Sequence, residues 1–279
     1  MLKNKKVMSL IIASFCLGLF CGPVVAQDKD VVIPLTLEDM TGKSKIELSM
    51  PMLPGDHYFG LPIMLSAQLG MGNTSLGIHL PMAYYSPDGE GDSKFALGSP
   101  TIDFKMHMCQ RGAWAMCYGF GVAVSVGFMD IDDGAEGFAQ LVGMFGHQDP
   151  VYHMSEAIGL RPLGFFAITN GELFAQAEFG TALYIPIMDT EGKDAYEAGI
   201  LYQVAVGYTL MEMVTPMIEL RGVSPVTQEG QDTRFWMNFG ARGYFGAIQP
   251  VFRLGIPLTD DAELGADVHI ELGCAIVFE

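Results

Sequence analysis

The chain has 279 residues, half of them hydrophobic, and a formal net charge of −17 at pH 7. A chain this acidic repels phosphate backbones, which excludes nucleic-acid binding driven by electrostatics. After the N-terminal segment, no run of about 18 uncharged apolar residues follows, which argues against a bundle of membrane-spanning helices. The 34 glycines and the 11% aromatic content are instead typical of all-β proteins with long strands.

The N-terminus has the three regions of a secretory signal peptide. Three lysines lie within residues 1–6, an apolar run covers residues 8–20, and residues 24–26 form a small-residue cleavage site. The apolar run is short for a spanning helix, so we favour cleavage over a retained anchor. We expect residues 1–26 to be removed and residues 27–43 to form a periplasmic segment. Cleavage removes three lysines and no acids, which leaves a charge of −20.

Further along the chain, apolar residues alternate with small or polar ones. In residues 196–210 one face is apolar at every second position and has a tyrosine near each end. This segment is far longer than the usual soluble strand of five or six residues, and it predicts a tilted strand that crosses a membrane. Alternation predicts strands at residues 75–85, 102–108, 114–128, 172–185, 196–210, 234–243 and 248–256. The connections between strands add residues 45–50, 58–69 and 268–278, one strand between residues 154 and 170, and one between residues 212 and 223.

The connections between these segments alternate in length. Short turns are expected at residues 72–73, 110–112, 170–171, 211–212 and 246–247, and long links at residues 51–56, 86–99, 129–154, 187–195, 223–233 and 259–267. In bacterial barrels the turns are periplasmic and the long loops lie outside. An exported chain that starts and ends in the periplasm needs an even number of strands, and residues 45–50 bring the total to twelve. We therefore predict an all-β, closed antiparallel transmembrane β-barrel over residues 44–279, located in the bacterial outer membrane. A soluble two-sheet sandwich is the alternative.

The longest link, residues 129–154, contains an apolar stretch at residues 138–145. This stretch either folds inward and plugs the pore or belongs to an ordinary surface loop. The acidic links are expected to be solvated, with a divalent-cation site at the cell surface as the alternative. We expect no metal site in the strands and no cofactor.

Three cysteines remain after cleavage: Cys109, Cys117 and Cys274. A three-residue turn at residues 110–112 would pair Cys109 with Ala113. Cys117 would then lie about 13 Å further along, at ~3.4 Å per residue. A disulfide needs Cα atoms within about 7 Å of each other, so none is predicted.

The inner faces of the predicted strands collect ionisable residues. These candidates for the lumen are Asp103, Lys105, His107, Arg161, Glu178, Glu197, Glu219, Arg221, Arg234, Arg242, Arg253, His269 and Glu271. They either form ion pairs that fill a narrow lumen or line a permeation path that selects solutes by charge. The inward positions of Phe174, Tyr184 and Trp236 favour a filled lumen.

Two turns set the expected register between neighbouring lumen residues. The turn at residues 170–171 would pair Thr169 with Glu172, which places Arg161 opposite Gly180 and diagonal to Glu178. The turn at residues 246–247 would place Arg253 opposite Gly240 and diagonal to Arg242.

The last strand has the pattern that barrel-assembly machinery recognises: a polar residue, a glycine, a hydrophobic residue and an aromatic residue at fixed spacing. Glu271, Gly273, Ile276 and Phe278 fit this pattern, although Phe278 is penultimate rather than terminal. The expected partners are therefore membrane lipids, the barrel-assembly machinery and small-molecule solutes.

Residues 97–105, LGSPTIDFK, resemble the Gly-Asp-Pro-Thr-Leu-x-x-Lys motif of the outer-membrane family linked to the meta pathway of phenol degradation. Ser99 stands where the family has an acid. Residues 219–222 and 254–258 resemble later parts of the same family, and the similarity extends from Gly60 onward. The resemblance implies an outer-membrane barrel that acts as a transporter.

An enzyme is the remaining possibility. His153 and Ser155 resemble the His-x-Ser motif of the outer-membrane phospholipase A family, but Ser155 is expected to face inward and the flanking residues do not match. No Ser-His-Asp arrangement stands out in the sequence. We therefore expect a passive channel or transporter for small solutes, hydrophobic or aromatic ones included, and not an enzyme. A non-conducting scaffold with a filled lumen is the alternative, and a lipid-modifying enzyme is the remote one.

Overall fold

The structure is a computed structural model, and it describes the strands and the shorter connections of the chain. The described residues are 43–52, 58–87, 94–110, 113–126, 157–186, 197–227, 233–259 and 268–278. Within these ranges, no helix is long and apolar enough to cross a membrane. Several predictions concern residues outside these ranges: the signal peptide (1–26), the periplasmic segment (27–42), the inward-folding stretch (138–145) and the His-x-Ser motif (153–155).

The described residues form thirteen strands in one antiparallel sheet. The strands are β1 (Ser44–Met52), β2 (Tyr58–Gly70), β3 (Thr74–Pro87), β4 (Lys94–Leu97), β5 (Thr101–Gln110), β6 (Ala115–Val126), β7 (Ala157–Thr169), β8 (Leu173–Pro186), β9 (Glu197–Tyr208), β10 (Val214–Pro225), β11 (Arg234–Gly243), β12 (Ile248–Pro257) and β13 (His269–Phe278). Most have ten or more residues, which is the length that a tilted strand needs to cross a bilayer.

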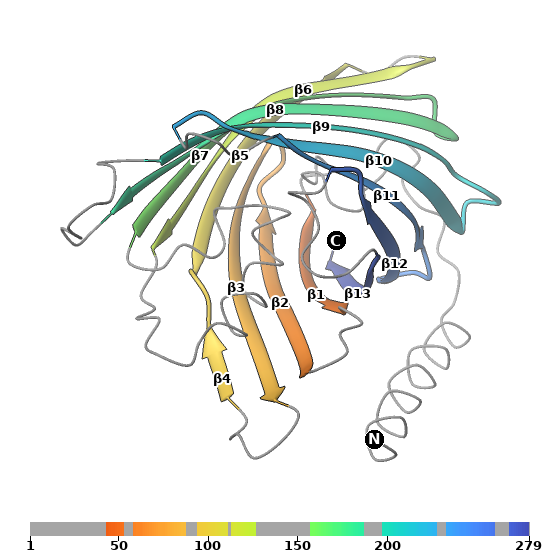
Figure 1. Ribbon diagram of the computed structural model, residues 1–279. Coiled ribbons are helices and arrows are strands. Elements are labelled where there is room, and N and C mark those ends of the chain that lie inside the picture. Colours follow the sequence, from red (N-terminus) through yellow and green to blue (C-terminus); the bar gives the residue numbers. More distant parts are fainter. Residues whose placement is uncertain are drawn as a thin grey trace, which may run out of the picture.

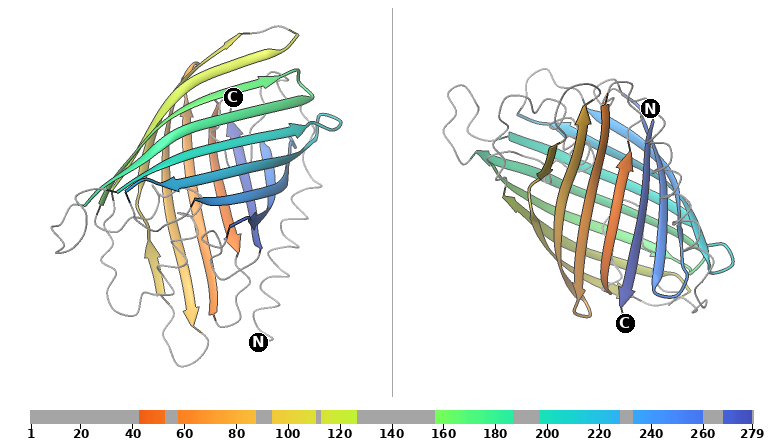
Figure 2. Two further views of the ribbon diagram at one scale, coloured as in Figure 1. Left: turned by 45° about the horizontal axis from the view of Figure 1, so that its top comes forward. Right: turned by 90° about the horizontal axis from the view of Figure 1, so that it is seen from below.

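The sheet closes on itself because β1 pairs with β2 on one side and with β13 on the other. Figure 1 shows the strands curving around a common axis, and the right-hand view of Figure 2 shows β13 beside β1. Closure pairs the two edges that an open sheet would leave exposed. The predicted closed barrel is therefore confirmed.

The predicted number of twelve barrel strands is also confirmed, because β4 and β5 are two parts of one barrel position. Both pair with β3: β4 lies along Met82–Tyr85, and β5 lies along Thr74–His79. The prediction of a loop throughout residues 86–99 is wrong for Lys94–Leu97. This short strand pairs with one part of β3, and β5 pairs with another part. Residues 98–100 separate the two paired segments.

The two faces of the strands have opposite chemistry, as the alternation predicts. In β9, Val204 and Val206 are 49% and 48% exposed, whereas Ala205 between them is fully buried. The same contrast holds in β6, where Phe120 is 52% exposed and Ala123 is 2% exposed. The barrel therefore presents an apolar exterior, which hydrocarbon covers in a membrane, around a polar interior.

The tight turn before β12 follows its prediction. Gly246 takes a φ of 67°, and Phe245 pairs with Ile248 across the turn. Arg253 therefore lies opposite Gly240, as expected.

The turn before β8 is displaced by one residue from its prediction. Gly171 has a φ of 90°, and the side-chain Oδ1 of Asn170 accepts hydrogen bonds from the backbone N–H groups of Glu172 (3.1 Å) and Leu173 (2.8 Å). Gly171 and Glu172 thus form the centre of the turn, and Thr169 pairs with Phe174. The predicted pairing of Arg161 with Gly180 is wrong, since Gly180 lies opposite Leu163.

The prediction of no disulfide is wrong as well. Cys109 and Cys117 are bonded, with a Cα–Cα distance of 4.1 Å. The link between β5 and β6 is longer than the three residues expected, so that Gln110 pairs with Met116 and Cys109 pairs with Cys117. The predicted partner of Cys109, Ala113, lies in this link. A register shift by an even number of residues leaves every side chain on its original face, so alternation alone cannot detect it.

Candidate functional site

The charged side chains inside the barrel form the candidate site. The lumen cations are Lys45, Lys105, Arg161, Arg221, Arg234, Arg242 and Arg253. The lumen carboxylates are Glu47, Asp103, Glu178, Glu219 and Glu271. His107 and His269 are also buried on the inner face. Glu197 begins β9, and its side chain lies outside the described part of the structure.

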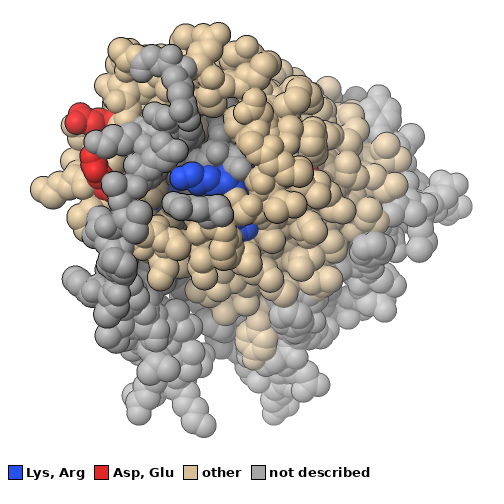
Figure 3. All heavy atoms as spheres, turned by 180° about the vertical axis from the view of Figure 1, so that it is seen from behind, with Lys and Arg blue, Asp and Glu red and all other residues tan. Residues whose placement is uncertain are grey.

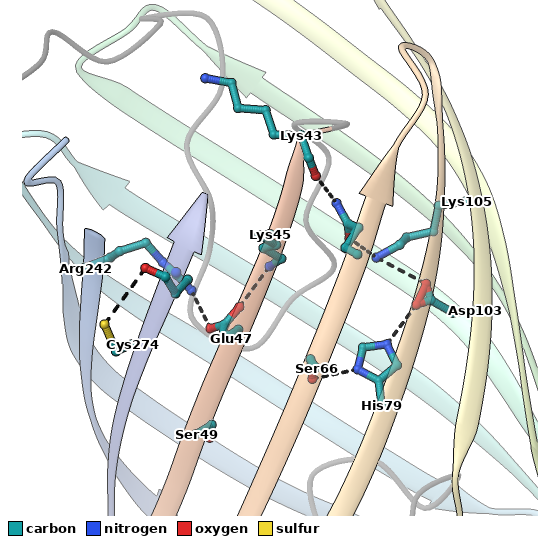
Figure 4. A network of polar contacts seen from close by, with 12 residues as sticks. Lys43, Lys45, Glu47, Ser49, Ser66, His79, Asp103, Lys105, Arg242 and Cys274 are labelled. Atoms are coloured by element: carbon teal, nitrogen blue, oxygen red, sulfur yellow. Dashed lines mark hydrogen bonds and ion pairs between the residues drawn. The ribbon is translucent and has the colours of Figure 1, made fainter. Parts of the chain in front are cut away.

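One polar network runs along the wall formed by β2, β3 and β5 (Figure 4). His79 Nε2 lies 2.8 Å from Asp103 Oδ1, and His79 Nδ1 lies 2.9 Å from Ser66 Oγ. Lys105 Nζ lies 3.5 Å from the other oxygen of Asp103 and donates a 3.0 Å hydrogen bond to Gln68 Oε1. Gly77 lies opposite Asp103, and the space that a Cβ would occupy there holds the aspartate carboxylate. Asp103 is therefore contacted by two basic side chains.

Ser66, His79 and Asp103 form a serine–histidine–aspartate chain of hydrogen bonds that the sequence analysis did not find. Hydrolysis by such a chain needs donors for an oxyanion, which are usually backbone N–H groups. Ser66 lies in the middle of β2, paired with Glu47 of β1 and His79 of β3, so its own backbone N–H belongs to the sheet. The arrangement thus fits a structural network of the wall better than a catalytic triad.

A second network connects β1 with β11 across two intervening strands. Glu47 forms ion pairs with Lys45 at 2.9 Å and with Arg242 at 3.2 Å. Arg242 is 1% exposed and lies on β11, so its side chain reaches past β12 and β13 to meet Glu47. This contact ties the first strand to the C-terminal half of the barrel from the inside.

A third group of contacts lies next to the second. Arg253 of β12 pairs with Glu271 of β13, and Ser49 Oγ of β1 donates a hydrogen bond to the same carboxylate. Arg253 also interacts electrostatically with Glu219 and Arg221 of β10. The inner wall from β10 to β1 is therefore one continuous charged surface.

Glu178 of β8 accepts hydrogen bonds from two side-chain amides. Gln176 Nε2 donates to one carboxylate oxygen at 2.8 Å, and Gln203 Nε2 donates to the other at 3.1 Å. All three side chains are buried. Two hydrogen bonds to a carboxylate compensate part of the cost of its burial.

Apolar side chains also point inward. Tyr184, Leu201, Val223 and Trp236 form one buried cluster with two alanines. Phe174 belongs to a second cluster. The predicted inward positions of Phe174, Tyr184 and Trp236 are confirmed. The lumen is therefore packed with side chains at these levels, and Glu219 inside it is fully shielded from solvent.

From one side the barrel surface is hollowed, and lysine or arginine side chains are visible inside the hollow (Figure 3). Acidic side chains are visible at one margin of the same face. Among the described residues, no group of three or more histidine, cysteine, aspartate or glutamate side chains could hold a metal ion. The side chains of known charge inside this hollow are therefore cationic.

Three lumen residues, Lys45, Glu47 and Gln68, are not among the candidates predicted from the sequence. The sequence carries a signal for the first two, because Lys45 and Glu47 alternate with the apolar Ile46 in a segment predicted as a strand.

A closed antiparallel barrel with an apolar exterior and a charged interior is a membrane-spanning β-barrel of the outer-membrane class. The sequence matches no known protein family, and no curated protein matches it either.

Three solved structures with this fold are an outer membrane channel and two porins. The COG4313 outer membrane channel from Pseudomonas putida F1 superposes with a TM-score of 0.61 at 12% identity, over 91% of this chain and 100% of that chain. The NanC porin gives a TM-score of 0.52 at 9% identity, over 83% and 98% of the two chains. The KdgM porin, solved in complex with disordered oligogalacturonate, gives 0.50 at 10% identity, over 84% and 99%. At these identities the likeness shows a shared fold, that of outer-membrane barrels.

Proposed function

We propose that the protein is a passive outer-membrane channel for small solutes, hydrophobic or aromatic ones included, that works without a cofactor. The observation that carries this proposal is the contrast between the apolar exterior and the charged interior of one closed barrel. Stability alone does not require so many ionisable groups inside, because buried ion pairs are often no more stable than packed hydrophobic residues. A polar path for solutes explains why they are there.

The similarity in fold to an outer-membrane channel and two porins supports the same proposal. The resemblance of residues 97–105 to the family linked to phenol degradation supports solutes that include aromatic compounds. We place that resemblance at the start of β5, where Asp103 and Lys105 enter the lumen network.

Conductance measurements test the proposal. The full-length exported chain, refolded into planar lipid bilayers, should give discrete conductance steps, and proteoliposomes should swell in small sugars. Protein-free bilayers and heat-denatured protein are the controls. If folded protein gave neither conductance nor solute flux, the channel proposal would be refuted.

A second candidate, a non-conducting scaffold, is favoured by one observation. Arg242, Arg253 and Arg161 are 1%, 3% and 4% exposed, so the lumen is filled where these arginines lie. If the channel is active, these side chains must move aside or leave a narrow path. The same conductance experiment separates the two candidates.

Export and assembly complete the proposal. Residues 1–26 would direct export, residues 27–43 would lie in the periplasm, and the barrel-assembly machinery would recognise the last strand. In β13, Ile276 and Phe278 of the recognition pattern are each 46% exposed on the outer face. Glu271 lies on the inner face. An enzymatic role for Ser155 is not proposed, although loss of a lipase activity in Ser155→Ala would revive it.

A further inference from the structure

We infer that the channel selects for anions, and this inference rests on the proposed function. It follows from the charge balance of the inner wall, which is opposite in sign to that of the whole chain. The chain carries −17 overall, whereas among the lumen side chains that the structure describes seven cations face five carboxylates, a surplus of two positive charges. Solutes inside the barrel are therefore surrounded by cationic side chains, although the protein as a whole is acidic.

The hydrogen-bonding partners of the carboxylates strengthen this asymmetry. Glu47 is contacted by two cations, Asp103 by Lys105 and His79, and Glu271 by Arg253 and Ser49. A cation that enters the lumen has to compete with these donors for each carboxylate.

An anion meets the opposite situation. Each guanidinium has five N–H donors and each ammonium has three, and the described inner wall has seven such cations for five carboxylates. An entering carboxylate or halide adds an acceptor where donors are in excess, and charge-assisted hydrogen bonds of this kind are the stronger ones. The solute class is therefore small anions, including organic acids.

The positions of the lumen cations bring them close to any ion that passes through the barrel. Arg161 lies on β7 and Lys105 on β5, whereas Arg221, Arg242 and Arg253 lie on β10 to β12 across the barrel. Cations thus project inward from both sides of the lumen. Because the described lumen is packed, a passing ion comes within a few ångströms of these groups, well inside the Debye length of about 10 Å at 0.1 M salt.

The reversal potential across a bilayer with a KCl gradient tests the inference. K⁺ and Cl⁻ have nearly equal mobilities in water, so a potential that differs from zero reports selectivity. For two surplus charges at short range, partly screened by salt, we expect Cl⁻ to be about fivefold more permeant than K⁺.

Two lumen variants locate the effect. Arg161→Gln with Arg234→Gln removes the surplus, and the permeability ratio should fall to about one. Glu212→Gln is the matched control: it changes one charge in the turn between β9 and β10, outside the lumen, and should leave the ratio unchanged. A difference in gel mobility between unheated and heated protein verifies that each variant is folded. If the double variant does not fold, Arg234→Gln alone, at a half-buried position, should lower the ratio by about half of the full change.

The outcomes are distinguishable. Three results overturn this inference: a channel that prefers K⁺, a channel with no preference, or an anion preference that the lumen variants leave unchanged. In each of these cases the channel proposal still stands. Absence of any conductance overturns the channel proposal, and the inference is lost with it.

Discussion

We expect the disulfide between Cys109 and Cys117 to contribute measurably to the free energy of unfolding of the barrel. The two residues are eight positions apart in the sequence, and they join β5 to β6 next to the turn. A cross-link that closes a loop of this size lowers the entropy of the unfolded chain, which stabilises the folded state by about 2.5 kcal/mol. Reduction should therefore lower the free energy of unfolding by about this amount.

Urea titration of the protein in detergent micelles, followed by tryptophan fluorescence, measures this difference. Wild-type protein is compared with and without reductant, because reduction breaks the bond and keeps both sulfur atoms in place. The variant Cys109→Ala/Cys117→Ala should lose more, since Cys117 also packs against Leu163 and Phe165. Cys274→Ser, at the free cysteine, is the control: it keeps the disulfide, so reductant should lower its free energy of unfolding by the same amount as in the wild type. Equal stability of oxidised and reduced wild-type protein, or free thiols at both positions in a mass map, would refute the reasoning.

Two further predictions concern the faces of the barrel wall, and both use the same urea titration. Val204→Arg, near the middle of β9 on the outer face, should cost about 2–4 kcal/mol, whereas Leu210→Arg beyond the end of that strand should cost at most about 1 kcal/mol; equal costs would argue against a bilayer around β9. Gly222→Ala should destabilise by about 1–3 kcal/mol because the ring of Tyr202 occupies the space of the new methyl group, whereas Gly199→Ala meets only ordinary contacts and serves as its control. A Gly222→Ala variant as stable as the control would show that Tyr202 moves aside without cost.

The sequence predicts the barrel well because the period of two is a physical consequence of the fold. In a strand between lipid and lumen, successive side chains point alternately to the two sides. The residue types of Val204 and Gln203 therefore indicate which side each faces, even when the neighbouring strands are unknown. The number of strands follows from the same logic, since turn lengths and export fix its parity. The faces of most site residues could be predicted for this reason.

Contacts between site residues could not be predicted in the same way. Alternation leaves the register free to shift by any even number of residues, and both wrong pairings are shifts of this kind: four residues at Cys109 and two at Arg161. The ion pair between Glu47 and Arg242 joins residues far apart in the sequence through the closure of the barrel. Only the three-dimensional arrangement reveals it.

The serine–histidine–aspartate chain illustrates the same limit. Ser66, His79 and Asp103 lie on three neighbouring strands, and no spacing in the sequence marks them as a group. Their hydrogen bonds depend on the register of two strand pairs at once.

Spin-label accessibility along β9 tests the central claim most directly, namely that this wall separates hydrocarbon from a polar interior. Single labels are placed at Gln203, Val204, Ala205 and Val206 in a Cys274→Ser background, and the protein is reconstituted in lipid vesicles. Collisions with oxygen, which concentrates in hydrocarbon, should be frequent at Val204 and Val206 and rare at Gln203 and Ala205. Uniform oxygen accessibility along the strand, or frequent collisions of the outward labels with a water-soluble nickel complex, would contradict the account.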